Sequence, residues 1–502
     1  MGKRILFLMI LPALVFALAG MAQAWQGRMG GMGDPYGLVA DEADFLTHPA
    51  KIAKGEGVRF YGDYRFTYNG VTDWDFTLDR FNAAAGTLVD NYHFDTSGDE
   101  YRHNALVGAA FPVWLGRMGA FFTYDGMRGD YDGDEDHFGA YYASYDLDKG
   151  LDNFALRLLY GLPVWGVDVG LELGMAYRDE QQKTWILGVQ NYPWSFGGYN
   201  ASLFPLMIPY DSQYWELLWR AGTELKLLPV TIAISLRGGY IICSDNEYHY
   251  RTDSPAYNGD LEGDVSGWRI GSDIWVRVPG GDPTVTFPIL FSFDYAEKKR
   301  DGEAIGAGAS DPGQLYRYTH REHSFDLKAG GGIEKKLGGN ALIAGGIYYN
   351  YLEGSDDFDF TRDTRSTQTD DLPFAKEHRV LLRLAGEKEL SPTVTLRMGL
   401  NGFFGWVMED FQDEAYLPAV FDWQDAISLD GSHWGIGASL GGTIKIPPIT
   451  LEPFINFNYQ QTKLDGDGER FEAGTITDLW EMDKSRNEWS IGGGLSILFN
   501  LP

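Results

Sequence analysis

Residues Trp489–Phe499, WSIGGGLSILF, alternate between two kinds of side chain. One face carries Trp, Ile, Gly, Leu, Ile and Phe, and the other begins with Ser, Gly, Gly and Ser. A period of two is the signature of a β-strand whose two faces meet different surroundings. The stretch therefore predicts a strand with one apolar face and one small, polar face.

The same alternation recurs toward the N-terminus in pairs of segments joined by short turns that contain Pro or Gly. With a first strand at 57–69 and the last at 487–499, the pattern predicts an all-β, closed antiparallel barrel of about 16 strands. Segment 71–100 is long enough to contain one further hairpin. The seven predicted hairpins are 101–126, 151–178, 214–242, 265–297, 322–353, 377–407 and 432–463.

An aromatic residue marks the loop-side end of one strand in each pair, on the same parity as the apolar residues of that strand. Amphipathic rings settle at the boundary between lipid and water, so this placement favours a barrel that crosses a bilayer. The predicted membrane-interface belt consists of Tyr68, Tyr124, Tyr177, Tyr240, Tyr295, Tyr351, Phe404 and Tyr459.

The composition is acidic, with 71 Asp and Glu against 41 Lys and Arg, which argues against nucleic acid as a partner. The single cysteine, Cys243, excludes an internal disulfide, and the absence of a C-x-x-C-H motif excludes covalent haem attachment. The sequence predicts no cofactor.

The N-terminus has the pattern of a secretory signal: Lys3 and Arg4, an apolar run, and then Ala22-Gln23-Ala24. We expect residues 1–24 to be a cleaved signal peptide, 25–56 a plug-like segment and 57–502 the barrel. Export of a barrel predicts the outer membrane of a Gram-negative bacterium, with lipid and lipopolysaccharide as partners. An even strand number puts the short turns in the periplasm and the long acidic loops, such as 127–150 and 408–431, outside.

The parity set by the tyrosines sends charged residues inward, where they avoid a cost of about 2–4 kcal/mol per charge facing lipid. Two interpretations stay open. Rows of arginine beside carboxylates create a field that filters solutes, or they form a salt-bridged wall that anchors a plug. The pore-lining candidates are Arg65, Arg157, Glu216, Arg220, Glu224, Arg237, Arg269, Asp273, Arg379, Arg383, Arg397 and Glu452.

Catalytic and metal-binding signals are weak. His320 and His323 are three apart on a strand and should point to opposite faces, so no metal site is predicted there. The acidic segment Asp130–Asp136 does not fit the calcium loop, since Glu135 stands where that loop needs glycine. Weak calcium binding shared with lipopolysaccharide stays open, and no catalytic residue is assigned.

Residues 31–57, GMGDPYGLVADEADFLTHPAKIAKGEG, resemble the opening of FadL-type outer-membrane transport proteins. The resemblance lies in a glycine-rich start, Ala40-Asp41 and Pro49-Ala50, with His48 where that family has Asn. It implies that residues 25–56 act as a hatch inside the barrel. The C-terminal strand resembles the recognition signal that outer-membrane barrels present to the barrel-assembly machinery.

These features predict a channel or transporter for passive or gated diffusion of small solutes. One alternative is a scaffold barrel that docks or sheathes another exported protein. A third hypothesis is a hydrolase at the outer rim, which would use a Ser–His or Asp–His pair. The solute and the oligomeric state stay open.

Overall fold

The computed structural model describes residues 28–29, 32, 38–39, 42–137, 141–190, 210–250, 259–305, 315–338, 340–362, 366–417, 421–472 and 475–501. The predicted signal peptide, residues 1–24, lies outside the described residues. Within the described part of the chain, no helix is long and apolar enough to span a membrane.

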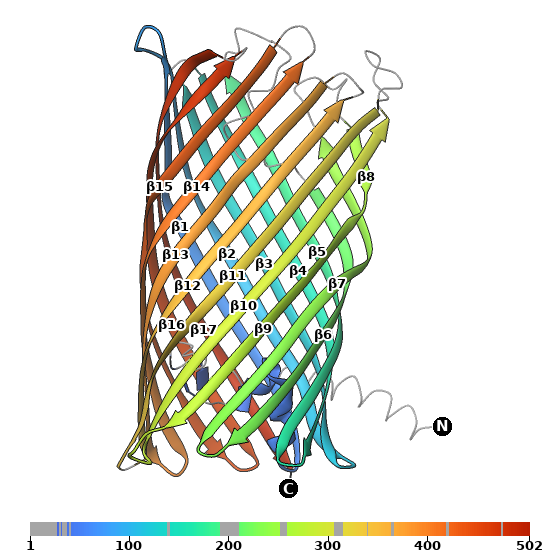
Figure 1. The fold of residues 1–502 in the computed structure, drawn as a ribbon, viewed down its shortest axis with the longest axis vertical. Coiled ribbons are helices and arrows are strands. Elements are labelled where there is room, and N and C mark those ends of the chain that lie inside the picture. The colour runs from blue at the N-terminus through green and yellow to red at the C-terminus, as the bar shows by residue number, and fades with distance from the viewer. Residues whose placement is uncertain are drawn as a thin grey trace.

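Long tilted strands wrap around a closed cylinder, and the short turns gather at the end where the C-terminus lies (Figure 1). Two 3₁₀ helices, η1 (Glu42–Leu46) and η2 (Pro49–Lys54), precede the first strand. The strands are β1 (Val58–Asn82), β2 (Thr87–Val113), β3 (Gly116–His137), β4 (Tyr141–Val164), β5 (Val167–Gln190), β6 (Tyr210–Leu227), β7 (Val230–Tyr250), β8 (Gly259–Gly263), β9 (Val265–Pro279), β10 (Val285–Ile305), β11 (Leu315–Leu337), β12 (Ala341–Arg362), β13 (Ser366–Ser391), β14 (Val394–Leu417), β15 (Phe421–Ile446), β16 (Ile449–Glu472) and β17 (Thr475–Leu501).

The barrel closes where β1 pairs with both β2 and β17, all antiparallel. Strands β8 and β9 form one interrupted strand, because β7 and β10 each pair with both of them. The predicted closed barrel of 16 strands is therefore confirmed. Segment 71–100 contains no further hairpin; it forms the outer halves of β1 and β2.

The two faces of each strand divide as the alternation predicts. In β14, Met398 and Leu400 are each 57% exposed on the outside, whereas the preceding residue, Arg397, is 5% exposed. Similar runs of exposed apolar residues occur outside on β4, β5, β7 and β13. The barrel therefore presents an apolar surface outward and keeps its charged side chains inside.

The aromatic belt is more complete than the sequence interpretation proposed. The predicted Tyr68 lies 5.0 Å from Tyr101 and 5.1 Å from Trp489, measured between ring centroids. The other predicted rings also meet an aromatic or histidine partner on the adjacent strand, or lie opposite one in the register. These partners share the parity of the predicted residues and so carried the same signal: Phe154, Trp215, Trp268, Phe325, His378, Trp434 and Trp489.

The acidic segments expected to be long loops are mostly strand. Residues 127–150 contain the end of β3 and the start of β4, with Asp130 opposite Asp148 in the register. Segment 408–431 likewise lies mainly in β14 and β15. Beyond the belt both faces meet water, so the period-of-two signal fades although the backbone hydrogen bonds continue.

From the short turns to the belt, each strand has about the 9–11 residues that a tilted strand needs to cross a bilayer, as in Val58–Tyr68. At the short-turn end, Trp114 and Trp165 have φ of 53° and 49° and are 97% and 100% exposed. These rings mark a second boundary, opposite the belt, that the sequence interpretation missed.

Neighbouring residues of β14 provide a test of the two faces. Leu400→Arg places a charge against lipid and should lower the free energy of unfolding by about 2–4 kcal/mol. Asn401→Arg places the same charge in the lumen and should cost far less. Urea unfolding of the barrel in lipid vesicles measures both values, and equal losses would contradict the assigned faces.

Candidate functional site

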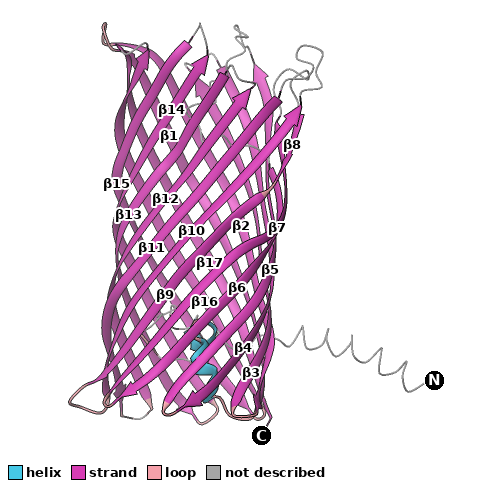
Figure 2. Cartoon of the chain, turned by 45° about the vertical axis from the view of Figure 1, so that its right-hand side comes forward, coloured by secondary structure: helices cyan, strands magenta, loops and turns pink. Residues whose placement is uncertain are grey.

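The helices η1 and η2 lie inside the barrel near the short-turn end (Figure 2). Three glycines on adjacent strands make room for them: Gly161, Gly170 and Gly222, which are opposite one another in the register. A Cβ at Gly170 would lie 2.3 Å from the Ala50 nitrogen, and one at Gly161 would lie 2.6 Å from Ile52. Any side chain at these two positions would meet η2. We call the described residues between 28 and 54 the inner segment.

Wall residues hold the end of η1 through its carbonyl groups. The Arg157 guanidinium donates to the Leu46 carbonyl at 2.8 Å, and Arg220 donates to the same oxygen. The Ser235 hydroxyl donates to the Thr47 carbonyl at 3.2 Å. Free carbonyls at a helix end attract cations, so these contacts fit their positions.

Charged residues of η2 face both the wall and η1. Lys54 forms an ion pair with Glu224 of β6, and Lys51 forms one with Asp44 at 2.6 Å. The Lys51 ammonium also lies 3.9 Å from the ring centroid of Trp275, a cation–π contact. Burial lowers the pKa of Lys51, and Asp44 opposes that shift.

Apolar contacts complete the seat of the inner segment. The Phe45 ring lies 5.5 Å from the Tyr61 ring and 5.3 Å from the Phe121 ring. Further back in the chain, Met29, Met32, Leu38 and Val39 pack on Ala344 and Ala385 of the wall. The inner segment thus touches the barrel on two sides.

Other predicted lumen charges form ion pairs that cross an intervening strand. Arg269 of β9 pairs with Glu216 of β6 at 2.6 Å, and Gly239 of β7 lies beneath the pair. Arg237 of β7 donates to Asp294 of β10 at 2.7 Å over Gly271. A glycine on the middle strand leaves the space that each bridge occupies.

The remaining candidates lie elsewhere on the inner wall. Arg397 contacts Glu387 at 2.7 Å and Glu452 at 3.2 Å. Of the others, Arg237 also pairs with Asp273, Arg379 pairs with Glu377, Arg65 lies 3.7 Å from Asp63, and Arg383 lines a cavity. Much of the wall charge is therefore paired, which is the arrangement of the second interpretation.

The two histidines of the H-x-x-H motif have different partners, as the strand period predicts. The His320 ring lies 3.4 Å from the buried Arg300 guanidinium of β10. The Nδ1 of His323 lies 2.5 Å from the Ser355 hydroxyl of β12. Among the described residues, no group of three or more His, Cys, Asp or Glu side chains could hold a metal ion.

Comparison of the fold with solved structures finds other barrels. The chain is similar to the Pseudomonas putida toluene transporter TodX, with 10% identity, a TM-score of 0.40, and coverage of 95% of this chain and 99% of that one. It is also similar to a Pseudomonas aeruginosa FadL homologue, with 10% identity, a TM-score of 0.41, and coverage of 96% and 99%. No protein-family model matches the chain, and no curated protein is similar to it.

His48, between η1 and η2, is completely buried beside the Trp275 ring. Burial lowers its pKa to about 3, and the nearby cations Lys51 and Arg220 lower it further in the same direction. The docked segment therefore holds a neutral imidazole, whereas a released segment would expose one with an ordinary pKa near 6.5.

Acidification should therefore weaken docking. Below pH 6.5 the released form binds a proton that the docked form does not. The free energy that favours docking therefore falls progressively between pH 6.5 and pH 3, and it is smaller by about 2 kcal/mol at pH 5. Hydrogen–deuterium exchange of residues 42–54, corrected for the intrinsic rate, should rise between pH 7 and pH 5. His48→Asn should remove this dependence; an unchanged profile in that variant would contradict the role of His48.

Proposed function

We propose that the protein is an outer-membrane channel for passive or gated diffusion of small solutes, and that residues 25–56 act as its hatch. A 16-strand barrel is wide enough to hold water unless it is filled. The supporting observation is the inner segment itself. It occupies the lumen through ion pairs, hydrogen bonds and side-chain packing, which are all non-covalent and can break and re-form.

The placement in the membrane belongs to the same proposal. The apolar outer surface between the aromatic belt and the turn tryptophans is the part that would contact lipid, and the acidic strand ends would face lipopolysaccharide. The signal peptide, residues 1–24, would direct export, and the C-terminal strand β17 would engage the barrel-assembly machinery.

Deletion of residues 25–56 tests the channel. In planar bilayers, we expect the full mature chain to give small or intermittent ohmic currents and the deletion variant to give larger, steady ones, since the hatch fills part of the lumen. Detergent without protein is the blank. Failure of both proteins to conduct, with the barrel folded, would overturn the proposal.

The paired arginines give a second measurement on the same channel. Arg237→Gln and Arg397→Gln remove the arginine that pairs with Asp294 and with Glu452, respectively, and so add negative charge to the lumen. We expect the reversal potential in a salt gradient to shift toward cation selectivity in both variants. Arg317→Gln, whose exposed pair with Glu303 lies beyond the belt, is the matched control.

A rim hydrolase is a second candidate, favoured by one contact. Ser355 and His323 lie just beyond the belt on the parity of the outward-facing residues, with Ser355 9% exposed. The distance between the Ser355 hydroxyl and the His323 Nδ1 allows proton transfer. Glu297 lies opposite His323 in the register of the next strand. Such an arrangement would act on ester bonds near the outer leaflet.

A fluorophosphonate probe separates the hydrolase from the channel. If Ser355 is an activated nucleophile, the probe should label the folded protein, and both Ser355→Ala and His323→Gln should abolish labelling. Ser324→Ala, next to His323, serves as the control. If the probe does not label the wild-type protein, the contact between Ser355 and His323 is only a hydrogen bond between strands, and the hydrolase is contradicted.

A further inference from the structure

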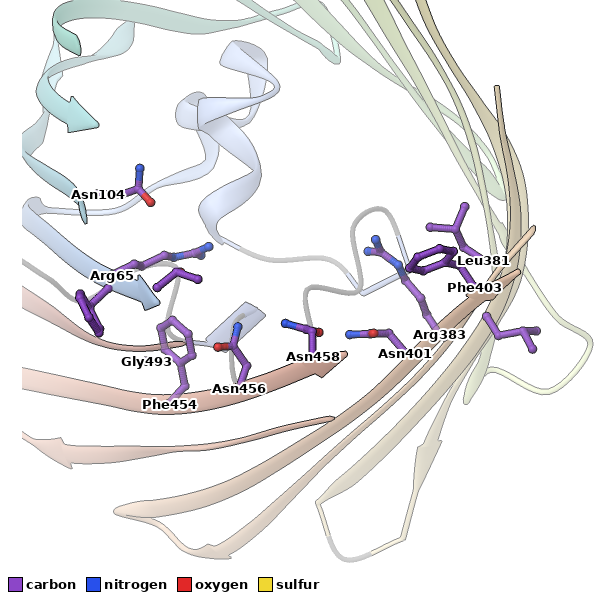
Figure 3. Close-up of a pocket in the computed structure, with 14 residues that line it drawn as sticks. Arg65, Asn104, Leu381, Arg383, Asn401, Phe403, Phe454, Asn456, Asn458 and Gly493 are labelled. Carbon is purple, nitrogen blue, oxygen red and sulfur yellow. The ribbon is translucent and has the colours of Figure 1, made fainter. Parts of the chain in front are cut away.

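A hollow of about 310 Å³ in the lumen is lined by residues of β13, β14, β16, β17, β1 and β2 (Figure 3). Carboxamide side chains from β14 and β16 project into it, between Arg65 on one side and Arg383 on the other. None of the residues that line the hollow is a carboxylate, although the chain carries 71 of them.

Inward glycines form the floor of this hollow. Asn401, Gly437 and Asn458 are opposite one another on β14, β15 and β16. A Cβ at Gly437 would lie 2.1 Å from the Asn458 oxygen and 2.5 Å from the Asn401 oxygen. The two carboxamides therefore lie over the bare backbone of the strand between them.

The same arrangement repeats one level closer to the short turns. Asn456 lies over Gly492, where an added Cβ would approach its oxygen to 2.4 Å and the Thr67 hydroxyl to 3.2 Å. We call Thr67, Asn401, Asn456 and Asn458 the amide strip. Its floor includes Gly437 of β15 and Gly492, which belongs to the small face of the stretch WSIGGGLSILF.

Two carboxamides of the strip have no hydrogen-bond partner within the described part of the chain. The Asn456 oxygen is buried and unpartnered, and Asn401 makes no hydrogen bond there either. Asn458 uses one donor, toward the Ser490 hydroxyl at 3.2 Å. The Asn456 nitrogen and both polar atoms of Asn401 are not buried and have no partner in that part of the chain, so a ligand with matching groups can form hydrogen bonds with them.

The chemistry of the strip selects hydroxyl groups. A carboxamide both donates and accepts hydrogen bonds, as a hydroxyl does, whereas a carboxylate only accepts. The cations at the two ends do not favour an anion strongly. Arg65 already lies near Asp63 and over the Phe454 ring, 5.5 Å from its centroid, and Arg383 also has contacts of its own.

Aromatic rings border the strip and lie close to glycines. A Cβ at Gly435 would lie 2.5 Å from the Phe403 ring, and one at Gly494 would lie 2.4 Å from the Phe454 ring. Apolar edges beside a few convergent polar groups are typical of sites for small organic molecules. A ring compound with hydroxyl groups on its rim matches both parts.

We propose that the amide strip binds neutral, polyhydroxylated solutes of the carbohydrate class. The passage of such solutes rests on the channel proposed above, but their binding to the strip does not. The experiments therefore measure binding and conduction separately.

Maltotriose is the probe, with toluene and gluconate as the hydrophobic and the anionic comparison. In isothermal titration of the detergent-solubilised barrel, we expect maltotriose to bind to the wild type and gluconate and toluene to bind more weakly. Asn401→Leu combined with Asn456→Leu keeps the side-chain size and removes both amides. It should weaken binding by roughly tenfold or more, since each lost hydrogen bond changes affinity about fivefold.

Asn153→Leu is the matched control, because it removes a lumen-facing amide on β4, outside the strip. Its affinity for maltotriose should equal that of the wild type. The heat-dependent shift of the barrel in gel electrophoresis shows whether the double variant is folded. If it is not, the single Asn401→Leu variant replaces it, and we expect that variant to bind maltotriose about fivefold more weakly than the wild type.

In bilayers, maltotriose should block current through the wild type and not through the double variant. Conduction without any binding or block by maltotriose would overturn the strip and leave the channel standing. Binding without conduction would overturn the channel and leave the strip. Equal binding by wild type and double variant, or preference for gluconate or toluene, would overturn the strip.

Discussion

The need to satisfy the backbone N–H and C=O groups of every strand determines the rest of this structure. In hydrocarbon, a sheet meets that need only if it has no free edge. Here β1 hydrogen-bonds to β17 along nearly its whole length, from Val58 opposite Leu501 to Asn82 opposite Asp478. Closure then separates two environments, and the alternation along every strand sorts side chains between them.

The lumen is shaped by where side chains are missing. Gly161, Gly170 and Gly222 seat the inner segment, Gly239 and Gly271 lie under ion pairs, and Gly437 and Gly492 lie under carboxamides. In each case a hydrogen atom in place of a side chain lets groups from other strands or from the N-terminal segment approach the wall. Because closure fixes the circumference of the barrel, the space left in the lumen depends on the size of the inward side chains. Inward glycines therefore make room for the docked inner segment, for the ion pairs and for the amide strip.

Charge pairing across strands explains how so many ions share one lumen. Arg237, between Asp273 and Asp294, spans three adjacent strands β7, β9 and β10. Inside a protein, an unpaired charge costs several kcal/mol of desolvation, and a partner at hydrogen-bond distance offsets much of that cost. The inner segment uses the same groups, since Arg157 and Arg220 contact Glu172 as well as the carbonyl of Leu46. Wall pairing and docking are therefore coupled at these two arginines.

The sequence alone determined the closed barrel, a strand number of about 16 and the inward or outward face of residues between the belt and the short turns, because a period of two and a belt of tyrosines are local signals. It did not determine the extension of β3 and β4 through residues 127–150, since strands wet on both faces lose that period. The cross-strand partners of each arginine, the pairing of His323 with Ser355 and the convergence of Asn401 with Asn458 over Gly437 were decided only by the tertiary structure. Those contacts depend on register between strands far apart in the chain, and register is set by closure of the whole cylinder.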